Sequence, residues 1–346
     1  MADPVEDTAG HPPSFDLDVE APSFWESPRQ KPLCVIALGG NAIKPPDSDG
    51  TFEAQMAAVE RTAKQIVDVM KAGYKVVLTH GNGPQVGALL LQQEQADPPA
   101  QPLSVCGAMS QGQIGYMLSQ KMYEQLEQRW KHVPVACLIT QSIIDPSDPA
   151  FDNPTKPIGP FVDEARAAEM RDAGMDVQQV RETGDRDYRR VVASPEPQGI
   201  VEEVPVKRLI DQRDLVICGG GGGVPVSREP GEIVGHDAVV DKDLLTQVIG
   251  NTLDANYLML LTDVDAVYRN YGEEDEERID EITADELRND LEAGEFPAGS
   301  MGPKVDAMVR FLDGETERER RGIIASLDDA VDALDGTAGT HVVNER

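Results

Sequence analysis

Residues 33–41 read LCVIALGGN, a short apolar run that ends at Gly39, Gly40 and Asn41. An unbroken apolar run of this length is typical of a strand buried on both faces, as parallel strands in α/β proteins are. Ligands in open α/β sheets bind at the carboxyl ends of such strands. The stretch therefore predicts an α/β fold with a candidate binding turn directly after its first strand.

The same pattern recurs along the chain. Further apolar runs predict strands at 75–79, 133–139, 214–218, 257–262 and 322–326. Segments between them predict helices at 52–71, 111–130, 202–212, 239–249, 284–291 and 301–312. Strands that alternate with helices predict an α/β fold in which a mostly parallel sheet lies between helix layers.

Two segments interrupt this alternation. Residues 1–31 are acidic and proline-rich, which predicts a flexible acidic tail before a folded domain at 32–346. Residues 145–200 are rich in Pro, Asp and Arg and are too long for a simple connection. Because they include strand-like YRRVV (188–192) and helical VDEARAAEMRDA (162–173), they predict a small inserted, lid-like subdomain.

Acidic residues dominate the charge of the chain. There are 62 Asp and Glu against 31 Lys and Arg in 346 residues, a formal charge of −31. Such a surface repels nucleic-acid phosphates and anionic lipids, so we expect neither as a partner. The sequence has no apolar run long enough to span a membrane and no secretory signal at 1–10, so we expect a cytoplasmic protein. Only 11 of the basic residues are Lys, which indicates adaptation to a salt-rich cytoplasm; the alternative is an ordinary acidic enzyme.

Glycine turns follow three of the predicted strands, at 39–41 (GGN), 80–85 (HGNGPQ) and 219–223 (GGGGG). Glycine lets backbone N–H groups approach an anion closely, and a following helix N-terminus adds a favourable dipole. A single turn of this kind is usually a feature of tight packing, but several at one sheet edge predict a ligand with more than one phosphate or carboxylate. The sequence contains no GxxxxGK[ST], and GNGPQVG is one residue too long for the dinucleotide fingerprint.

Three lysines stand in positions framed by glycine, proline or aspartate: Lys156 in PTKPIGP, Lys242 in VVDKDLL and Lys304 in GSMGPKV. A lysine taken singly is usually a solvated surface residue. Asp241 and Asp243 flank Lys242, however, and can orient it. Fixed cations and backbone N–H groups supply most of the catalysis in phosphoryl transfer, so the set favours that chemistry.

The remaining candidates are weaker. We expect His80, at a strand end, to be a packing residue rather than a base. Tyr268 in TDVDAVY follows a predicted strand and lies either beside a nucleotide base or in the core. We expect EEDEER (273–278) to be a solvated loop. The cysteines show no metal-ligand spacing and are expected to be small buried hydrophobes: Cys34, Cys106, Cys137 and Cys218.

Taken together, the motifs resemble the carbamate kinases of the amino acid kinase superfamily. They cover about residues 33–346 in the family order, and SQGQIGY and GSMGPKV are specific to carbamate kinases within the superfamily. The motifs are ALGGNAI (37–43), THGNGPQVG (79–87), AMSQGQIGY (108–116), CGGGGGVPV (218–226), AVVDKDLL (238–245), LLTDVDAVY (260–268), GSMGPKV (299–305) and GTHVV (339–343).

The resemblance implies a three-layer α/β/α sandwich with a small protruding subdomain, usually a homodimer. The implied reaction is ATP + carbamate ⇌ ADP + carbamoyl phosphate with Mg²⁺, which runs toward ATP in arginine fermentation. Implied catalytic residues are Lys242, Lys304, Lys156, Asp241, Asp243 and Asn41. Implied binding residues for carbamate and the phosphoryl group are Gly39, Gly40, Gly81, Asn82 and Gly83. Implied contacts to ATP are Gly219, Gly220, Gly221, Gly222, Asp263, Tyr268, Met301 and Gly302.

Two segments depart from the family pattern. GHDAVVDKD has His236 and Asp237 where relatives commonly carry Val-Glu, and YGEEDEE at 271–277 stands where the family often has a Gly-Lys-Pro turn near the nucleotide. Two other functions stay open. One is a sister kinase with a different carboxylate or phosphate acceptor, and the other is a non-catalytic nucleotide-binding protein. A sensor would be expected to lose its lysines, and all three are present.

We expect the free energy of unfolding to rise with KCl concentration, because salt screens the repulsion among the acidic residues. The Debye length, beyond which charges are largely screened, is about 10 Å at 0.1 M. Chemical unfolding in a series of KCl concentrations measures this dependence. A maximum of stability below about 0.2 M KCl, where screening is only partial, would contradict the interpretation as salt adaptation.

Overall fold

Strand β1, Leu33–Leu38, lies in the middle of the main sheet and is buried along its whole length. We analysed a computed structural model that describes residues 31–344 apart from 46–47, 96, 130–132, 182–183, 213–214 and 297–300. Almost all of the tail predicted at 1–31 lies outside the described residues. β1 pairs in parallel with β2 (Lys75–His80) on one side and β12 (Tyr257–Thr262) on the other.

The strand order of the main sheet is β15-β17-β16-β12-β1-β2-β9-β3. Its pairs are parallel except that between β16 and β17, which is antiparallel. The outer strands are β3 (Val135–Cys137), β9 (Leu215–Ile217), β15 (Glu281–Thr283), β16 (Arg321–Ser326) and β17 (Thr340–Val343). The parallel strands put several strand ends, and the turns after them, at one edge of the sheet.

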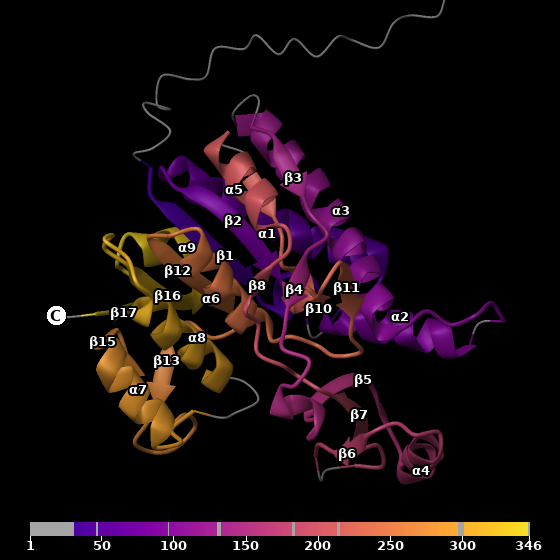
Figure 1. The fold of residues 1–346 in the computed structure, drawn as a ribbon. Helices are drawn as coiled ribbons and strands as arrows, with labels where there is room; N and C mark the ends of the chain where they lie inside the picture. The colour runs from indigo at the N-terminus through magenta and orange to yellow at the C-terminus, as the bar shows by residue number, and fades with distance from the viewer. Residues whose placement is uncertain are drawn as a thin grey trace, which may run out of the picture.

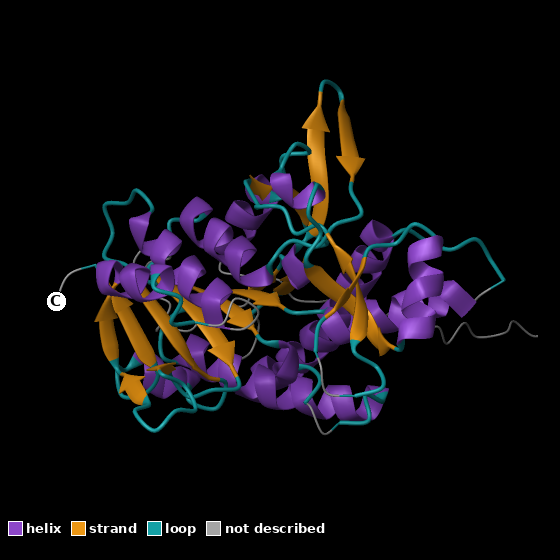
Figure 2. Cartoon of the chain, turned by 90° about the horizontal axis from the view of Figure 1, so that it is seen from below, coloured by secondary structure: helices purple, strands orange, loops and turns teal. Residues whose placement is uncertain are grey.

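Side chains that alternate along β1 divide the core into two layers. Val35 and Ala37 belong to one apolar cluster, whereas Cys34 and Ile36 belong to the other. The first cluster is covered by α5 (Glu203–Asp211), α6 (Lys242–Thr252), α7 (Ala284–Glu292) and α8 (Met301–Asp313). The second is covered by α1 (Phe52–Lys71), α3 (Leu103–Arg129) and α9 (Ala330–Leu334). Figure 2 shows helices on both sides of the strands, which confirms the predicted α/β/α sandwich.

Local sequence explains where the first long helix begins and ends. The Thr51 side chain accepts a hydrogen bond from the backbone N–H of Ala54 and so caps the start of α1. The helix stops before Gly73, whose φ of 108° is a conformation that L side chains rarely adopt. Its apolar positions, among them Val59, Ile66 and Val67, face the sheet.

Residues 156–192 form a separate group of elements that stands away from the main sheet (Figure 1). β5 (Lys156–Val162), β7 (Tyr188–Val192) and β6 (Val177–Gln179) make an antiparallel sheet, and α4 (Glu164–Asp172) packs on it around Ala167 and Met170. β5 contacts α2 (Gly83–Gln95) of the main body. These residues lie inside the stretch predicted as a subdomain, and the domain division itself stays a prediction.

Short strands complete the fold. β4 (Gln141–Ile143), β8 (Gly199–Ile200), β10 (Val224–Glu229) and β11 (Glu232–Gly235) form a second sheet, from which the β10–β11 hairpin projects (Figure 2). β13 (Val267–Arg269) and β14 (Glu277–Ile279) form a two-stranded ribbon.

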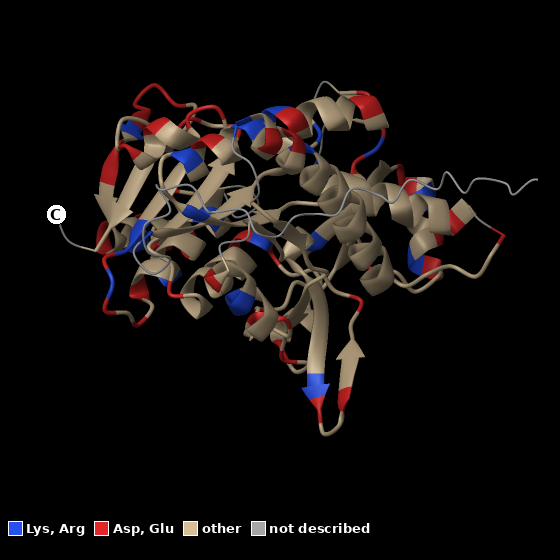
Figure 3. Ribbon diagram, turned by 90° about the horizontal axis from the view of Figure 1, so that it is seen from above, with Lys and Arg blue, Asp and Glu red and all other residues tan. Residues whose placement is uncertain are grey.

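Acidic residues are spread over many helices and loops (Figure 3). Among the described residues, none of the helices has both the length and the apolar character needed to span a bilayer.

Several predictions of detail were wrong. α3 begins at Leu103 rather than residue 111, because burial of Cys106 and Ser110 outweighs the weak helix propensity of its glycine- and serine-rich first turns. α2 was not predicted at all. α6 begins at Lys242 rather than at residue 239, because Asp241 caps the helix immediately before Lys242. Cys137 is exposed because β3 is an edge strand, whereas the other three cysteines are buried.

Candidate active site

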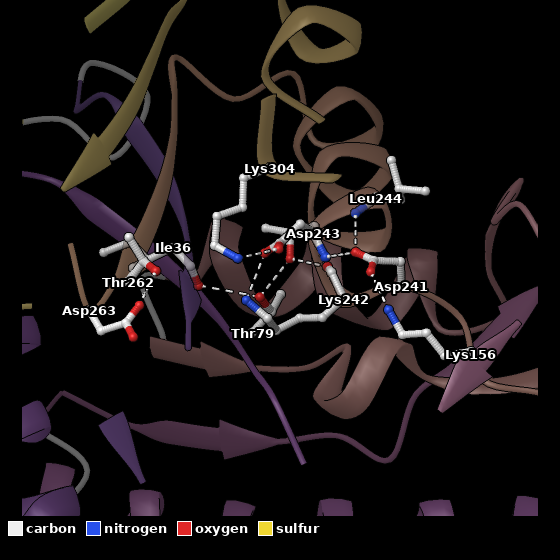
Figure 4. A network of polar contacts seen from close by, with 11 residues as sticks. Ile36, Thr79, Lys156, Asp241, Lys242, Asp243, Leu244, Thr262, Asp263 and Lys304 are labelled. Atoms are coloured by element: carbon white, nitrogen blue, oxygen red, sulfur yellow. Dashed lines mark hydrogen bonds and ion pairs between the residues drawn. The ribbon is translucent and has the colours of Figure 1, made fainter. Parts of the chain in front are cut away.

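Three lysines meet around two carboxylates where the helix layer and residues 156–192 approach one another. Lys242 Nζ lies 2.7 Å from Asp243 Oδ1, and Lys304 Nζ lies 3.2 Å from Asp243 Oδ2. Lys156 Nζ lies 2.7 Å from Asp241 Oδ2. Figure 4 shows this network, in which the lysines come from α6, α8 and β5. Residues far apart in the sequence thus form one cluster of ammonium groups.

Asp241 fixes both the start of α6 and the position of Lys156. Its Oδ1 accepts hydrogen bonds from the backbone N–H of Asp243 at 2.8 Å and of Leu244 at 3.4 Å, as an N-cap does. Its Oδ2 binds Lys156. Lys242 is therefore the first residue of a capped helix, whose N-terminus adds to the positive potential of the cluster.

Asp243 is shared between two ammonium groups. Only 6% of its side chain is exposed, and burial by itself would raise its pKa. The attraction of Lys242 and Lys304 and their hydrogen bonds outweigh burial and lower the pKa of Asp243 to about 2. The carboxylate is therefore ionised at neutral pH and holds two cations of like charge side by side.

A cavity of about 830 Å³ opens in front of these groups. It is lined by the turn at 81–83, by Gly221 and by all three lysines. Arg189 of β7 lines it too, a residue that the sequence analysis missed. Among the described residues that line it, four cations face two carboxylates, a local balance of about +2 in a chain of net charge −31. The cavity is suited to a multiply charged anion.

A second cavity of about 760 Å³ adjoins the first, and Lys304 lines both. It is bounded by the turn at 39–42 and by Thr262 and Asp263 at the end of β12. Asn41 Nδ2 donates a hydrogen bond to Asp263 Oδ2 at 3.2 Å. Because β1 and β12 are parallel neighbours, the structure brings these two predicted site residues together.

A third, more apolar pocket of about 430 Å³ lies near the start of α8. Tyr268, Tyr271, Phe296 and Met301 line it. Tyr268 is half-buried, and its hydroxyl donates to Asp265 Oδ1 at 2.9 Å, so it is a pocket residue and not a core residue. Met301 precedes Lys304 by three positions on α8, which puts both on the same face of the helix.

The five-glycine turn lies at the lysine cavity and not beside Tyr268. A Cβ at Gly222 would lie 2.0 Å from the carbonyl oxygen of Val240, and φ there is 84°, so only glycine fits. Gly221 lines the lysine cavity, and the other three predicted glycines, 219, 220 and 222, are buried. The predicted nucleotide contacts thus fall into two groups on opposite sides of β1. Gly302, also predicted, is buried in α8.

His80 is buried and packs against the same turn. Burial lowers its pKa to about 4, although a hydrogen bond to the carbonyl oxygen of Gly81 at 3.0 Å raises it in part. A Cβ at Gly220 would lie 2.4 Å from His80 Nε2. A neutral, enclosed imidazole agrees with the expectation of a packing residue.

Two arginines and an aspartate of the site were not predicted. Arg189 Nε donates to the carbonyl oxygen of Gly159 at 3.0 Å, and its guanidinium lies 5.2 Å from the centre of the Phe161 ring. Arg61 of α1 and Asp328 line the second cavity. The YRRVV strand carried one signal, since an arginine in a short apolar strand needs a polar surface to face. Arg61 and Asp328 lie in ordinary surface patterns and gave none.

Comparison with known proteins identifies the class to which this fold and site belong. The sequence profile described as the amino acid kinase family matches residues 32–325. The carbamate kinase of Thermococcus kodakarensis is 49% identical over 317 residues, which cover 90% of this chain and 99% of the relative. That of Halobacterium salinarum is 47% identical over 314 residues, covering 89% and 97%.

Solved structures agree. A carbamate kinase from Giardia lamblia bound to AMP-PNP superposes with a TM-score of 0.84 at 45% identity, covering 91% of this chain and 99% of that one. The chain therefore belongs to the amino acid kinase family, and its relatives place it among the carbamate kinases of that family.

We expect Asp243→Asn to destabilise the protein at pH 7, because two partly buried ammonium groups lose their shared counter-ion. The folded pKa of Asp243 is lowered, so its stabilising contribution is complete above the unfolded pKa of about 3.9 and is lost as pH falls toward about 2. The difference in unfolding free energy between wild type and variant should therefore shrink by about 2 kcal/mol between pH 4.5 and pH 2.5. Urea unfolding across this range measures it. A difference that is constant with pH would contradict the lowered pKa.

Proposed function

We propose that the chain catalyses reversible phosphoryl transfer between ATP and carbamate, forming ADP and carbamoyl phosphate. The observation that carries the proposal is the sharing of Asp243 by Lys242 and Lys304 at a cavity bounded by glycine turns. The carbamate kinases to which the chain is similar support the choice of substrate.

The proposed catalysis is electrostatic. Phosphoryl transfer passes through a loose transition state whose charge lies on the oxygens of the transferred group. An ammonium group has three N–H donors, and Asp243 accepts from Lys242 and from Lys304, which orients both toward the cavity. These lysines stabilise the transferred phosphoryl group, and the backbone N–H groups of the turns at 39–41 and 81–83 add further donors. Lys156, and with it Arg189, would close over the anion from the lid-like subdomain predicted within 145–200.

The cavities suggest how the substrates lie. The nucleotide base would occupy the apolar pocket of Tyr268, Tyr271 and Met301, with the phosphates running along the second cavity toward Lys304. Carbamate would bind in the lysine cavity beside the turn at 81–83. Lys304 lines both larger cavities and so lies between the two substrates. The five-glycine turn, assigned to ATP by the resemblance, would instead support the carbamate side.

Mg²⁺ would accompany the nucleotide. Among the described residues, no cluster of three or more His, Cys, Asp or Glu forms a metal site within the protein itself. Mg²⁺ in kinases is usually held by one or two carboxylates together with substrate phosphates, and Asp263 and Asp328 line the phosphate cavity. These residues fit such an ion, which when bound neutralises charge on the phosphates.

The proposed setting is ATP synthesis from carbamoyl phosphate in the cytoplasm during arginine fermentation. The nucleotide substrates of the reaction are cytoplasmic. The excess of acidic residues, with few lysines outside the site, suits a salt-rich interior.

We also propose a homodimer that buries the outer face of α3. Val105, Met109, Tyr116 and Tyr123 are exposed at helical spacing along this face, and Tyr116 is 60% exposed. Ile139, just beyond the edge strand β3, is exposed as well, and the Tyr123 hydroxyl is bonded to the backbone of Val135 in β3. The stripe spans roughly 27 Å at 1.5 Å per residue. A long apolar stripe on one straight helix can pack against its own copy about a two-fold axis.

We expect Lys242→Ala and Lys304→Ala each to lower kcat by about 10²–10³, the usual effect of losing one donor to a developing charge. The measurement is ATP formation from ADP and carbamoyl phosphate with Mg²⁺ in about 2 M KCl. At this salt concentration the Debye length is only a few ångströms, so the repulsion among the surface carboxylates is screened. Lys207→Ala is the control, because Lys207 pairs with Glu203 on the exposed face of α5. Absence of wild-type activity with carbamoyl phosphate, together with activity on another acceptor, would refute the proposed substrate.

We expect Tyr116→Glu to convert the proposed dimer to a monomer, because a carboxylate would be desolvated at the centre of the interface. Light scattering coupled to size-exclusion chromatography measures the mass. Val204→Glu serves as the control, since Val204 is equally exposed but lies on α5, on the opposite face of the sheet. A wild-type monomer, or a Tyr116→Glu dimer, would rule out this interface.

A further inference from the structure

Ser110 is the first residue of the SQGQIGY motif (110–116), and the phosphoryl transfer proposed above uses no residue of this motif. It lies in the first third of α3, has no exposed surface, and belongs to the buried side of the helix rather than to the exposed apolar stripe. α3 contacts the five-glycine turn there. Ser110 therefore lies behind the lysine cavity, on the side of the five-glycine turn that faces α3.

The direction of the hydrogen bonds at Ser110 is determined by its partners. Ser110 Oγ lies 2.6 Å from the carbonyl oxygen of Gly107, which can only accept, so the hydroxyl hydrogen of Ser110 is used there. The side-chain amide of Asn82 lies 2.8 Å from the same Oγ. Because that oxygen has no second hydrogen to donate, it must accept, and Asn82 must present its NH₂ group. The alternative flip of the amide would place two acceptors against each other.

The Asn82 side chain is also held from its other side. A Cβ at Gly221 would lie 2.1 Å from Asn82 Nδ2 and 2.5 Å from Asn82 Oδ1, so the face of the amide packs directly on the glycine turn. Gln111 supports this turn through Thr140: Gln111 Oε1 accepts from Thr140 N at 2.8 Å, and Thr140 Oγ1 accepts from Gly219 N at 2.8 Å. The amide is thus clamped between α3 and the turn, with its oxygen directed away from Ser110.

That oxygen is available to a ligand. Asn82 lines the lysine cavity, and no described residue donates a hydrogen bond to its Oδ1. A carbamoyl group carries an NH₂ donor, whereas an acetyl group of nearly the same shape carries a methyl group that donates nothing. An acceptor fixed at this point distinguishes the two, because a methyl group would leave it unpaired.

We propose that Ser110 is a positioning residue that fixes the Asn82 amide so that Oδ1 accepts an N–H of the carbamoyl amine. The contact makes the site specific for a carbamoyl phosphate over an acyl phosphate that lacks the amine. This inference rests on the proposed function and adds the group of the substrate that is read and the residues that read it.

The test compares carbamoyl phosphate with acetyl phosphate as phosphoryl donors to ADP. The readout is the kcat/KM for carbamoyl phosphate divided by that for acetyl phosphate, measured as ATP formation. Calorimetric titration of both compounds without ADP gives the corresponding ratio of binding affinities. Ser110→Ala should lower the ratio roughly tenfold, the effect of about one neutral hydrogen bond, because the amide can then flip. General loosening of the site would lower both rates equally and leave the ratio unchanged.

Ser142→Ala is the matched control. Ser142 is equally buried and also holds the glycine turn, by donating to the carbonyl oxygen of Gly222 at 2.5 Å, but its hydroxyl is not hydrogen-bonded to Asn82. Its ratio should equal that of the wild type. An unchanged ratio in Ser110→Ala, or an equal fall in Ser142→Ala, would overturn the proposal.

A second pair of variants covers the case in which Ser110→Ala does not fold. Asn82→Asp keeps an acceptor toward the amine and should keep the ratio even though its charge weakens binding of both phosphates. Asn82→Leu removes the acceptor and should lower the preference for carbamoyl phosphate over acetyl phosphate. Retention of the ratio in Asn82→Leu would overturn the proposal. A wild type that makes no ATP from carbamoyl phosphate would instead refute the proposed function.

Discussion

The arrangement of the site depends on one buried carboxylate, that of Asp243, held between the ammonium groups of Lys242 and Lys304. Two lysines of like charge repel each other, and both are largely shielded from water. The shared anion makes their proximity stable and is itself kept ionised by them, with its pKa lowered to about 2 despite burial. One negative charge against two positive charges leaves an excess that an anionic substrate can satisfy.

The fold makes this pair possible and surrounds it with backbone donors. β1 and β2 are parallel neighbours, so the turns at 39–41 and 81–83 lie against each other; a Cβ at Gly81 would be 3.5 Å from the backbone nitrogen of Gly40. α6 and α8 pack together on one face of the sheet and bring Lys242 and Lys304 to the same edge. Lys156 and Arg189 come from β5 and β7, outside the main sheet. Groups from three parts of the chain thus meet at a single cavity.

Local charge and total charge have opposite signs in this protein. A net charge of −31 repels anions at long range, whereas the lysine cavity is positive among its described lining residues. Salt screens the long-range repulsion but acts less on groups that are partly buried and close together. An acidic surface and an anion-binding site are therefore compatible when the ionic strength is high, because the substrate then experiences mainly the nearby lysines.

The sequence alone predicted the layers of the fold, which the structure confirms, and most residues of the candidate site. Uniformly apolar runs such as 33–38 are typical of strands that are buried on both faces, and glycine turns follow three of these runs, so both features are readable from the local sequence pattern. The three lysines and their aspartates were predicted because their immediate neighbours in the sequence are unusual, whereas the role of Asn41 came from the resemblance to carbamate kinases.

Only the tertiary structure decided which of these groups act together. It separated the five-glycine turn from Tyr268, because β9 and β12 lie on opposite sides of β1. It also brought Arg189 to the lysine cavity and Ser110 to the side chain of Asn82, which the sequence did not predict for either residue. Strand order and the direction of a hydrogen bond depend on partners distant in the chain. A local pattern can show that a residue is buried, but it does not identify the atom against which that residue packs.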